Sequence, residues 1–199
     1  MKLNWVDILI VIIMIRICYV SFKSGLSHEI FPLFGSIVIS VISIGYYNKI
    51  AAFINQNIIK IGYPVLNLAS FILLAVASSI VLRLLKVLLD KIIQVTWHPV
   101  IEKFGGIVAG VAKASIITSL VLMTLVMMPL SYLKWAVMDR SQFGMDFLKI
   151  APMVYAKLSP YLPDVVIDGA VVDKGAALHF LDEGPGAKGP DAPRGAGGK

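Results

Sequence analysis

Four long apolar runs dominate the first two thirds of the chain. They cover residues 5–20, 30–47, 65–82 and 104–133. The second and third contain no charged residue, and the fourth contains only Lys113. A helix of about 18 residues is about 27 Å long, which is close to the thickness of the hydrocarbon core of a bilayer. The pattern therefore predicts four membrane-spanning helices.

The connection between the first two runs is short. Residues 21–25 link them, and glycine can adopt the positive φ that a tight reversal requires. We expect an antiparallel helical hairpin with Lys23, Gly25 and Glu29 at its turn. Pro32 is predicted to lie in the first turn of the second helix, where its missing N–H has the smallest cost.

The first run has a second interpretation, a cleaved signal peptide. Lys2 suits the basic start of such a peptide. However, Arg16 interrupts the apolar region, and no small-x-small cleavage site follows. An uncleaved membrane helix is therefore the favoured interpretation.

The third helix is expected to continue beyond its uncharged part. Residues 48–63 form a polar connection, and Pro64 starts the helix. Polar side chains then recur at helical spacing opposite a face of leucine and isoleucine: Arg83, Lys86, Asp90 and Gln94. This pattern predicts an amphipathic helical extension that either projects past the membrane or lies along its surface. Residues 98–99, His-Pro, should end it.

The composition changes after the fourth run. Residues 141–161 mix apolar side chains with Asp, Lys and Pro, which predicts a short amphipathic helix at the interface, broken at Pro152 and Pro160. Residues 184–199 are mostly Gly, Pro and Ala, a composition that cannot bury a core and predicts disorder. We expect a four-helix transmembrane domain over 1–133, an interfacial amphipathic segment over 134–163 and a poorly ordered tail over 164–199.

The overall composition agrees with an all-α membrane protein. Apolar residues make up 58% of the 199 residues and charged ones 15%, against roughly 45–50% and about 25% in soluble domains. The net charge of +6 comes from Lys and Arg at the ends of the apolar runs, which indicates anionic headgroups rather than nucleic acid as the partner. Basic residues are equally frequent on both predicted sides, so the orientation stays open. An even number of spans places both termini on one side.

Small residues recur on two of the predicted helices. Gly106, Gly110 and Ala114 form one stripe on the fourth helix, and Ser36 and Ser40 repeat the spacing on the second. Small side chains allow the backbones of membrane helices to approach closely. The stripes predict either packing within one subunit or a contact between subunits in a homo-oligomer.

Three ionisable residues lie within predicted spans: Asp7, Arg16 and Lys113. Each lies near a predicted helix end, so its side chain could extend to the headgroups. The alternatives are a buried polar contact or an ion path, because charges inside membranes are costly and often functional. Asp7 and Arg16 are out of phase on their helix and should not pair with each other.

No motif for catalysis or metal binding is present. Cys18 is the single cysteine, and the spacing of His28, His98 and His179 matches no metal site. The sequence has no nucleophile elbow and no phosphate-binding loop. We therefore expect neither a metal nor another cofactor, and we do not expect an enzyme.

Several short motifs follow one another in a recognisable order. Residues 4–7 (Asn-Trp-Val-Asp) place an aspartate at the start of the first helix, and residues 22–25 (Phe-Lys-Ser-Gly) precede Glu29. A glycine-rich stretch, residues 102–106, then opens the fourth helix. Ser141 and Pro152, together with Gly110 and Lys113, complete the set. These motifs resemble the colicin V production (CvpA) family of bacterial inner-membrane proteins, over about residues 4–158.

The sequence departs from the family pattern at single positions. The family usually has an arginine where Lys113 stands, and small glycines where Ser21 and Ala114 stand. These differences put a close-packing role of the last two positions in doubt. The resemblance implies a link to the production or export of a peptide toxin, and it implies no catalytic activity.

Two functional hypotheses follow. The first is a non-enzymatic, multi-pass inner-membrane factor that supports colicin V-like toxin production or export, or envelope maintenance. Its partners would be the lipid bilayer, further copies of the chain, and an export or envelope protein. The second is an oligomeric channel or small transporter, in which Arg16 and Lys113 would line a polar path.

Overall fold

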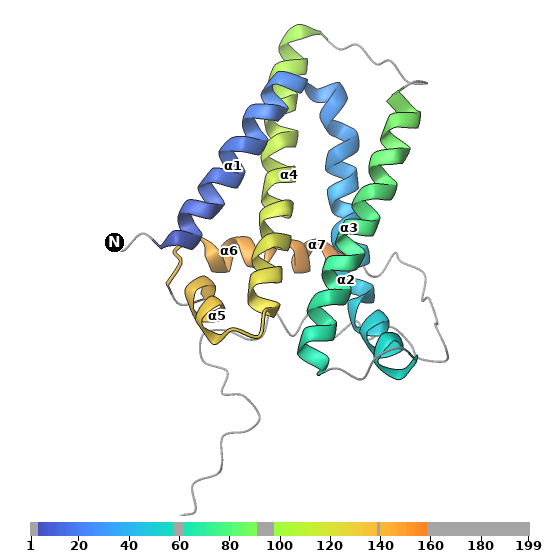
Figure 1. The fold of residues 1–199 in the computed structure, drawn as a ribbon. Helices are drawn as coiled ribbons and strands as arrows, with labels where there is room; N and C mark the ends of the chain where they lie inside the picture. The colour runs from blue at the N-terminus through green and yellow to red at the C-terminus, as the bar shows by residue number, and fades with distance from the viewer. Residues whose placement is uncertain (1–3, 58–61, 91–97, 139, 159–199) are drawn as a thin grey trace, which may run out of the picture.

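The computed structural model describes residues 4–57, 62–90, 98–138 and 140–158, and every regular element in these ranges is a helix. The four long helices are α1 (Trp5–Ser24), α2 (Leu26–Asn57), α3 (Tyr63–Asp90) and α4 (Pro99–Met127) (Figure 1). Each is long and apolar enough to cross a membrane, as the sequence predicts. The predicted tail, 164–199, lies outside the described residues.

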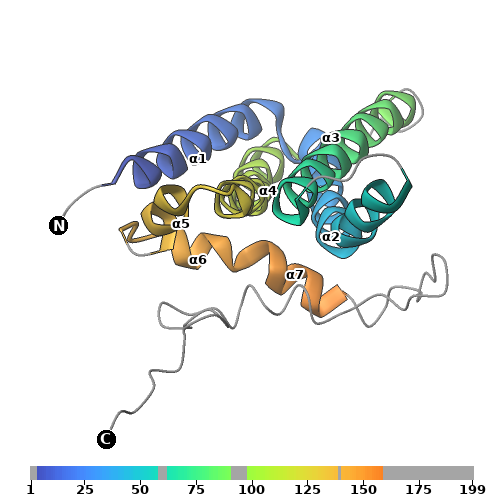
Figure 2. The same ribbon diagram turned by 60° about the horizontal axis from the view of Figure 1, so that its bottom comes forward.

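Three short helices follow at one end of the bundle. They are α5 (Ser131–Met138), α6 (Gly144–Leu148) and α7 (Ile150–Leu158). Figures 1 and 2 show α6 and α7 running crosswise to the long helices, beside the lower part of the bundle in Figure 1, where α6 contacts α4 and α7 contacts α2. The start of α1 lies at the same end, as an even number of spans requires (Figure 1).

Helix α4 is the centre of the bundle. It contacts α1 on one side and α2 on the other, whereas α3 packs mainly on α2 (Figure 2). Half of the apolar window of α4 is buried inside the protein, against 17% for α3 and 22% for α1. The outward side chains of α1 and α3 are largely apolar, which suits contact with lipid.

The apolar core lies toward the end that carries α5–α7. It includes Leu122 and Met123 of α4, Val137 of α5 and Tyr155 of α7. Tyr47 and Phe71 add an edge-to-face contact between α2 and α3, with ring centroids 6.1 Å apart. The opposite end, where α1 turns into α2, carries hydrogen bonds and an ion pair that join the long helices to one another.

The hairpin between α1 and α2 is tighter than the sequence predicts. Gly25 alone separates the two helices, and its φ is 78°. Helix α2 begins at Leu26, so Pro32 lies in its second turn and the prediction of a first-turn position is wrong. At that position a proline leaves the carbonyl of the residue four positions earlier without its helical donor.

Two further helix boundaries differ from those predicted. Helix α2 continues through Asn57 because the expected connection contains apolar residues, including the fully buried Ala51, that extend its packing face. Helix α4 begins at Pro99, which suits a first helical position, rather than at Phe104. It ends at Met127, two residues before Pro129.

The amphipathic regions are also placed by the structure. Helix α3 runs without interruption to Asp90, so the predicted extension forms over the described residues; Gln94 lies outside them. The predicted break at Pro152 is wrong. The helix is interrupted at Lys149 instead, and Pro152 lies in the first turn of α7, where no N–H is needed. Pro160 lies outside the described residues.

Candidate functional site

A buried ion pair joins α2 to α4 near the α1–α2 turn. Lys113 Nζ donates to Glu29 Oε2, and the two side chains are 12% and 4% exposed. Glu29 comes from the first turn of α2, and Lys113 from the interior of α4. Among the interpretations open for Lys113, this geometry corresponds to a buried polar contact. Arg16 is exposed on α1 and takes no part in it.

A second carboxylate closes the turn itself. Glu102, in the first turn of α4, accepts from Ser27 N through Oε1 at 3.1 Å and from Ser27 Oγ through Oε2 at 2.9 Å. The start of α2 is thereby capped by a side chain of another helix. A Cβ added to Gly25 would lie 2.6 Å from Glu102 Oε1, so a larger residue would displace the Glu102 side chain in addition to straining the backbone at this φ. Lys23, the remaining predicted turn residue, is exposed and lies over the ring of Tyr19.

The glycine stripe of α4 lies against α1 of the same chain. A Cβ on Gly106 would lie 2.9 Å from the carbonyl oxygen of Ser21 and 3.0 Å from the carbonyl carbon of Gly25. A Cβ on Gly110 would overlap the Cβ of Ser21. Ala114, the next residue of the stripe, is fully buried. The stripe therefore serves helix packing inside the subunit.

The serine pair on α2 is also buried. Ser36 Oγ donates to the carbonyl of Leu33 at 2.7 Å, and Ser40 Oγ donates to the carbonyl of Ser36 at 2.9 Å. Both hydroxyls thus donate to carbonyls of their own helix and need no partner on a neighbouring helix, and their small side chains allow close packing.

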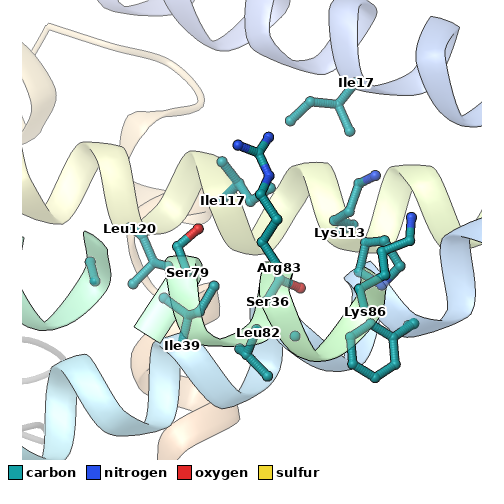
Figure 3. A pocket seen from close by; sticks show the side chains of 14 residues that line it. Ile17, Ser36, Ile39, Ser79, Leu82, Arg83, Lys86, Lys113, Ile117 and Leu120 are labelled. Carbon is teal, nitrogen blue, oxygen red and sulfur yellow. The ribbon is translucent and has the colours of Figure 1, made fainter. Parts of the chain in front are cut away.

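A cavity of about 530 Å³ lies beside the ion pair, between the four long helices. Its basic lining residues are Arg83, Lys86 and Lys113, which Figure 3 shows around the space between α3 and α4. Two serines, Ser36 and Ser79, also line it, and the remaining lining residues are apolar or glycine. Within the described ranges, none of its lining residues is acidic. The basic face of the α3 extension is therefore directed at this cavity.

Lys86 makes a contact that explains the position of Pro32. Its Nζ donates to the carbonyl oxygen of His28 at 3.3 Å. His28 is four residues before Pro32, so its carbonyl receives no helical N–H. The ammonium group of another helix supplies the missing donor. Pro32 is the sequence signal for this contact, because a proline inside a helix leaves the carbonyl four residues earlier without its donor.

The same relation recurs at the other end of the bundle. Pro152 leaves the carbonyl of Leu148 without a helical donor, and Ser119 Oγ of α4 donates to that carbonyl at 3.0 Å. Ser119 Oγ also accepts from Ala151 N at 2.9 Å. One buried hydroxyl thus joins α4 to the break between α6 and α7. No local pattern in the sequence indicates this role of Ser119.

Asp7 lies at this second end, far from the ion pair. It is 4% exposed, and its Oδ1 accepts from Ser141 Oγ at 2.6 Å and from Phe143 N at 3.4 Å. Its Oδ2 accepts from Asn4 N at 3.1 Å. Ser141 Oγ in turn accepts from Gly144 N at 2.8 Å. The carboxylate fixes the α5–α6 connection to the start of α1, which is a buried polar contact rather than an extension toward the headgroups.

We expect Ser141→Ala to destabilise the protein by about 1.5–3 kcal/mol, because a buried carboxylate loses its shortest hydrogen bond and Gly144 N loses its acceptor. Unfolding in detergent micelles, followed by tryptophan fluorescence, measures the change. Ser115→Ala is the matched control, since within the described part of the chain that hydroxyl donates to Val111 O of its own helix and joins no second element. Equal stability of the two variants would contradict the role assigned to Asp7.

These features define a class of protein, a multi-pass α-helical membrane protein whose helices are joined by buried polar contacts at both ends. The family model described as colicin V production protein matches residues 6–171, and the chain belongs to this family. The match confirms the resemblance drawn from the motifs, and the matched range contains Asp7, Glu29, Lys113 and Ser141. Searches of curated proteins and of solved structures gave no match.

Proposed function

We propose that the protein is a non-enzymatic factor of the bacterial inner membrane that supports production or export of a colicin V-like toxin, or maintenance of the envelope. The observation that carries the proposal is the family match over residues 6–171. The four helices that could cross a membrane agree with it. The proposal assigns the protein a supporting role beside other proteins of the membrane.

The geometry of the polar groups favours a structural role over a chemical one. Among the described residues, each buried carboxylate is engaged by a partner from a distant part of the chain: Asp7 by Ser141, Glu29 by Lys113. Glu102 likewise caps α2 from α4. These contacts hold the helices in fixed positions. A bundle fixed in this way is suited to present a surface to a partner.

The surface for such a partner would not be the glycine stripe, which is covered by α1. The opposite face of α4 carries exposed apolar side chains near its start, among them Phe104 and Val108, each 70% exposed. Lipid, a second copy of the chain or an export protein could cover this face. A homo-oligomer, if one forms, would have to use a surface of this kind.

A channel or small transporter is the second candidate function. The observation that favours it is the cavity between the long helices with Arg83, Lys86 and Lys113 in its lining. Such a lining would select anions. Arg16 does not line this cavity, so the expected path through Arg16 and Lys113 is not assembled within one copy. Anion efflux from proteoliposomes above that from empty vesicles would support this function.

A deletion strain that carries the toxin genes provides the test of the first proposal. We expect it to secrete less toxin than its parent, or to lose resistance to detergent, and wild-type protein should restore the lost property. Lys103→Gln, which changes an exposed side chain, should also restore it. Glu29→Ala should not, because it leaves Lys113 buried without its carboxylate. Immunoblots of membranes give the amount of each variant. A deletion strain with normal secretion and normal detergent resistance would refute the proposal.

A further inference from the structure

The cavity changes in character along its length. On α3 the lining residues in order are Ala75, Ser79, Leu82, Arg83 and Lys86, so the cations lie at the end nearest the α1–α2 turn. On α4 the order from that same end is Lys113, Ile117 and Leu120. On both helices the lining is basic toward the turn and apolar farther from it (Figure 3).

The level of the cations follows from the sequence of α3. Residues 65–82 contain no charge, and Arg83 is the first charged residue after them. Because such a run spans the hydrocarbon core, Arg83 and Lys86 lie where the core meets the headgroups. Phospholipid phosphates lie at this same level. The apolar part of the cavity then lies at the depth of the acyl chains.

The three basic residues of the cavity differ in whether a carboxylate neutralises their charge. Lys113 is paired with Glu29, and Lys86 donates to a neutral carbonyl. Arg83 has no ion-pair partner among the residues that the structure describes. A guanidinium binds phosphate through two parallel hydrogen bonds, and basic side chains at the headgroup level attract anionic lipids. Arg83 and Lys86 therefore leave positive charge for an external anion to neutralise.

We propose that this cavity binds one anionic phospholipid, with the headgroup phosphate on Arg83 and Lys86 and an acyl chain along Ala75, Ile117 and Leu120. The volume of about 530 Å³ lies within the roughly 300–1,000 Å³ of typical small-molecule sites, enough for a phosphate and part of a chain. The proposal does not rest on the role of the protein in toxin production.

Native mass spectrometry of the full-length protein, released from micelles containing phosphatidylglycerol, tests the proposal. We expect one retained phosphatidylglycerol, and at least about tenfold weaker binding in Arg83→Gln, because one charged, bidentate contact is lost. Arg83 has no ion-pair partner within the described chain, so this variant should fold. The double variant Arg83→Gln/Lys86→Gln should bind still more weakly.

The matched control is Lys23→Gln/Lys103→Gln, which removes two exposed cations from the same end of the bundle and leaves the cavity unchanged. It should retain the lipid. Equal losses in both double variants would overturn the proposal, since they would show attraction by net charge alone.

Two further probes separate a lipid from a free anion. Phosphatidylcholine with the same acyl chains should be retained at least about tenfold less often than phosphatidylglycerol. Ala75→Phe, which fills the apolar part, should weaken phosphatidylglycerol binding without changing the basic end. If millimolar inorganic phosphate displaces the lipid, the site takes a free anion and the lipid proposal fails. If Ala75→Phe binds the lipid as wild type does, no acyl chain lies along Ala75, and the proposal fails as well.

Discussion

Lys113→Met should destabilise the protein by about 3–5 kcal/mol, because it leaves the Glu29 carboxylate buried without its cation. Methionine has a similar length and no charge, so the effect comes mainly from the lost pairing. The midpoint of unfolding in mixed detergent micelles measures it. Lys103→Met is the control, since Lys103 is an exposed residue of the same helix, and we expect its stability to stay close to that of wild type.

The double variant Glu29→Gln/Lys113→Met separates pairing from packing. Replacing both members removes the uncompensated charge, so most of the lost stability should return. A coupling free energy near zero in this double-mutant cycle would show that the two residues do not stabilise each other. A Lys113→Met protein as stable as the Lys103→Met protein would contradict the prediction directly.

Gly106→Leu should prevent the close approach of α4 to α1. The atoms nearest to an added Cβ are backbone atoms of Ser21 and Gly25, which cannot move without separating the helices. We expect Gly106→Ala to lose about 1–3 kcal/mol and Gly106→Leu to lose more, despite the higher helix propensity of both residues. Unfolding in micelles and the fraction of protein recovered in the folded peak on size exclusion are the measurements.

Gly35→Ala provides the control for this prediction. An added Cβ there meets Leu82 Cδ1 at an ordinary 3.7 Å, and alanine favours a helix by about 1 kcal/mol. The variant should therefore match or exceed wild-type stability. Oligomeric state in nanodiscs gives an independent readout. A folded Gly106→Leu protein that differs from wild type only by losing an oligomer would mean that the stripe is a subunit contact after all.

Hydrophobic runs made the transmembrane part of the fold predictable. A run that must cross lipid has a fixed minimum length, so the four spans could be located from composition alone. Their ends were less predictable because packing decides them. Helix α2 continues past Tyr47 since Ala51 is buried by neighbours that no local pattern reveals. Pro32 is tolerated inside α2 because Lys86 donates to the carbonyl that the proline leaves free. Pro152 is tolerated because it lies in the first turn of α7, and Ser119 donates to the carbonyl at the end of α6.

The polar contacts could be predicted only as candidates. The sequence identifies Asp7 and Lys113 as ionisable residues whose burial in the membrane is unfavourable unless they have a polar partner. It does not identify their partners, Ser141 and Glu29, since these depend on which helices become neighbours. The sequence places Glu29 at the turn between the first two helices, whereas in the structure its side chain faces α4 and pairs with Lys113. The cavity could not be predicted from any local sequence pattern, because residues of four helices line it.

The contact between Asp7 and Ser141 also sets an order of events during synthesis. The two residues are 134 positions apart, so Asp7 reaches the membrane well before its partner has been made. At roughly 5–20 residues per second the delay is on the order of ten seconds. During that interval the Asp7 carboxylate has the backbone N–H of Asn4 as a partner but lacks Ser141 and Phe143. The α5–α6 connection can therefore be fixed to α1 only after all four long helices have been synthesised.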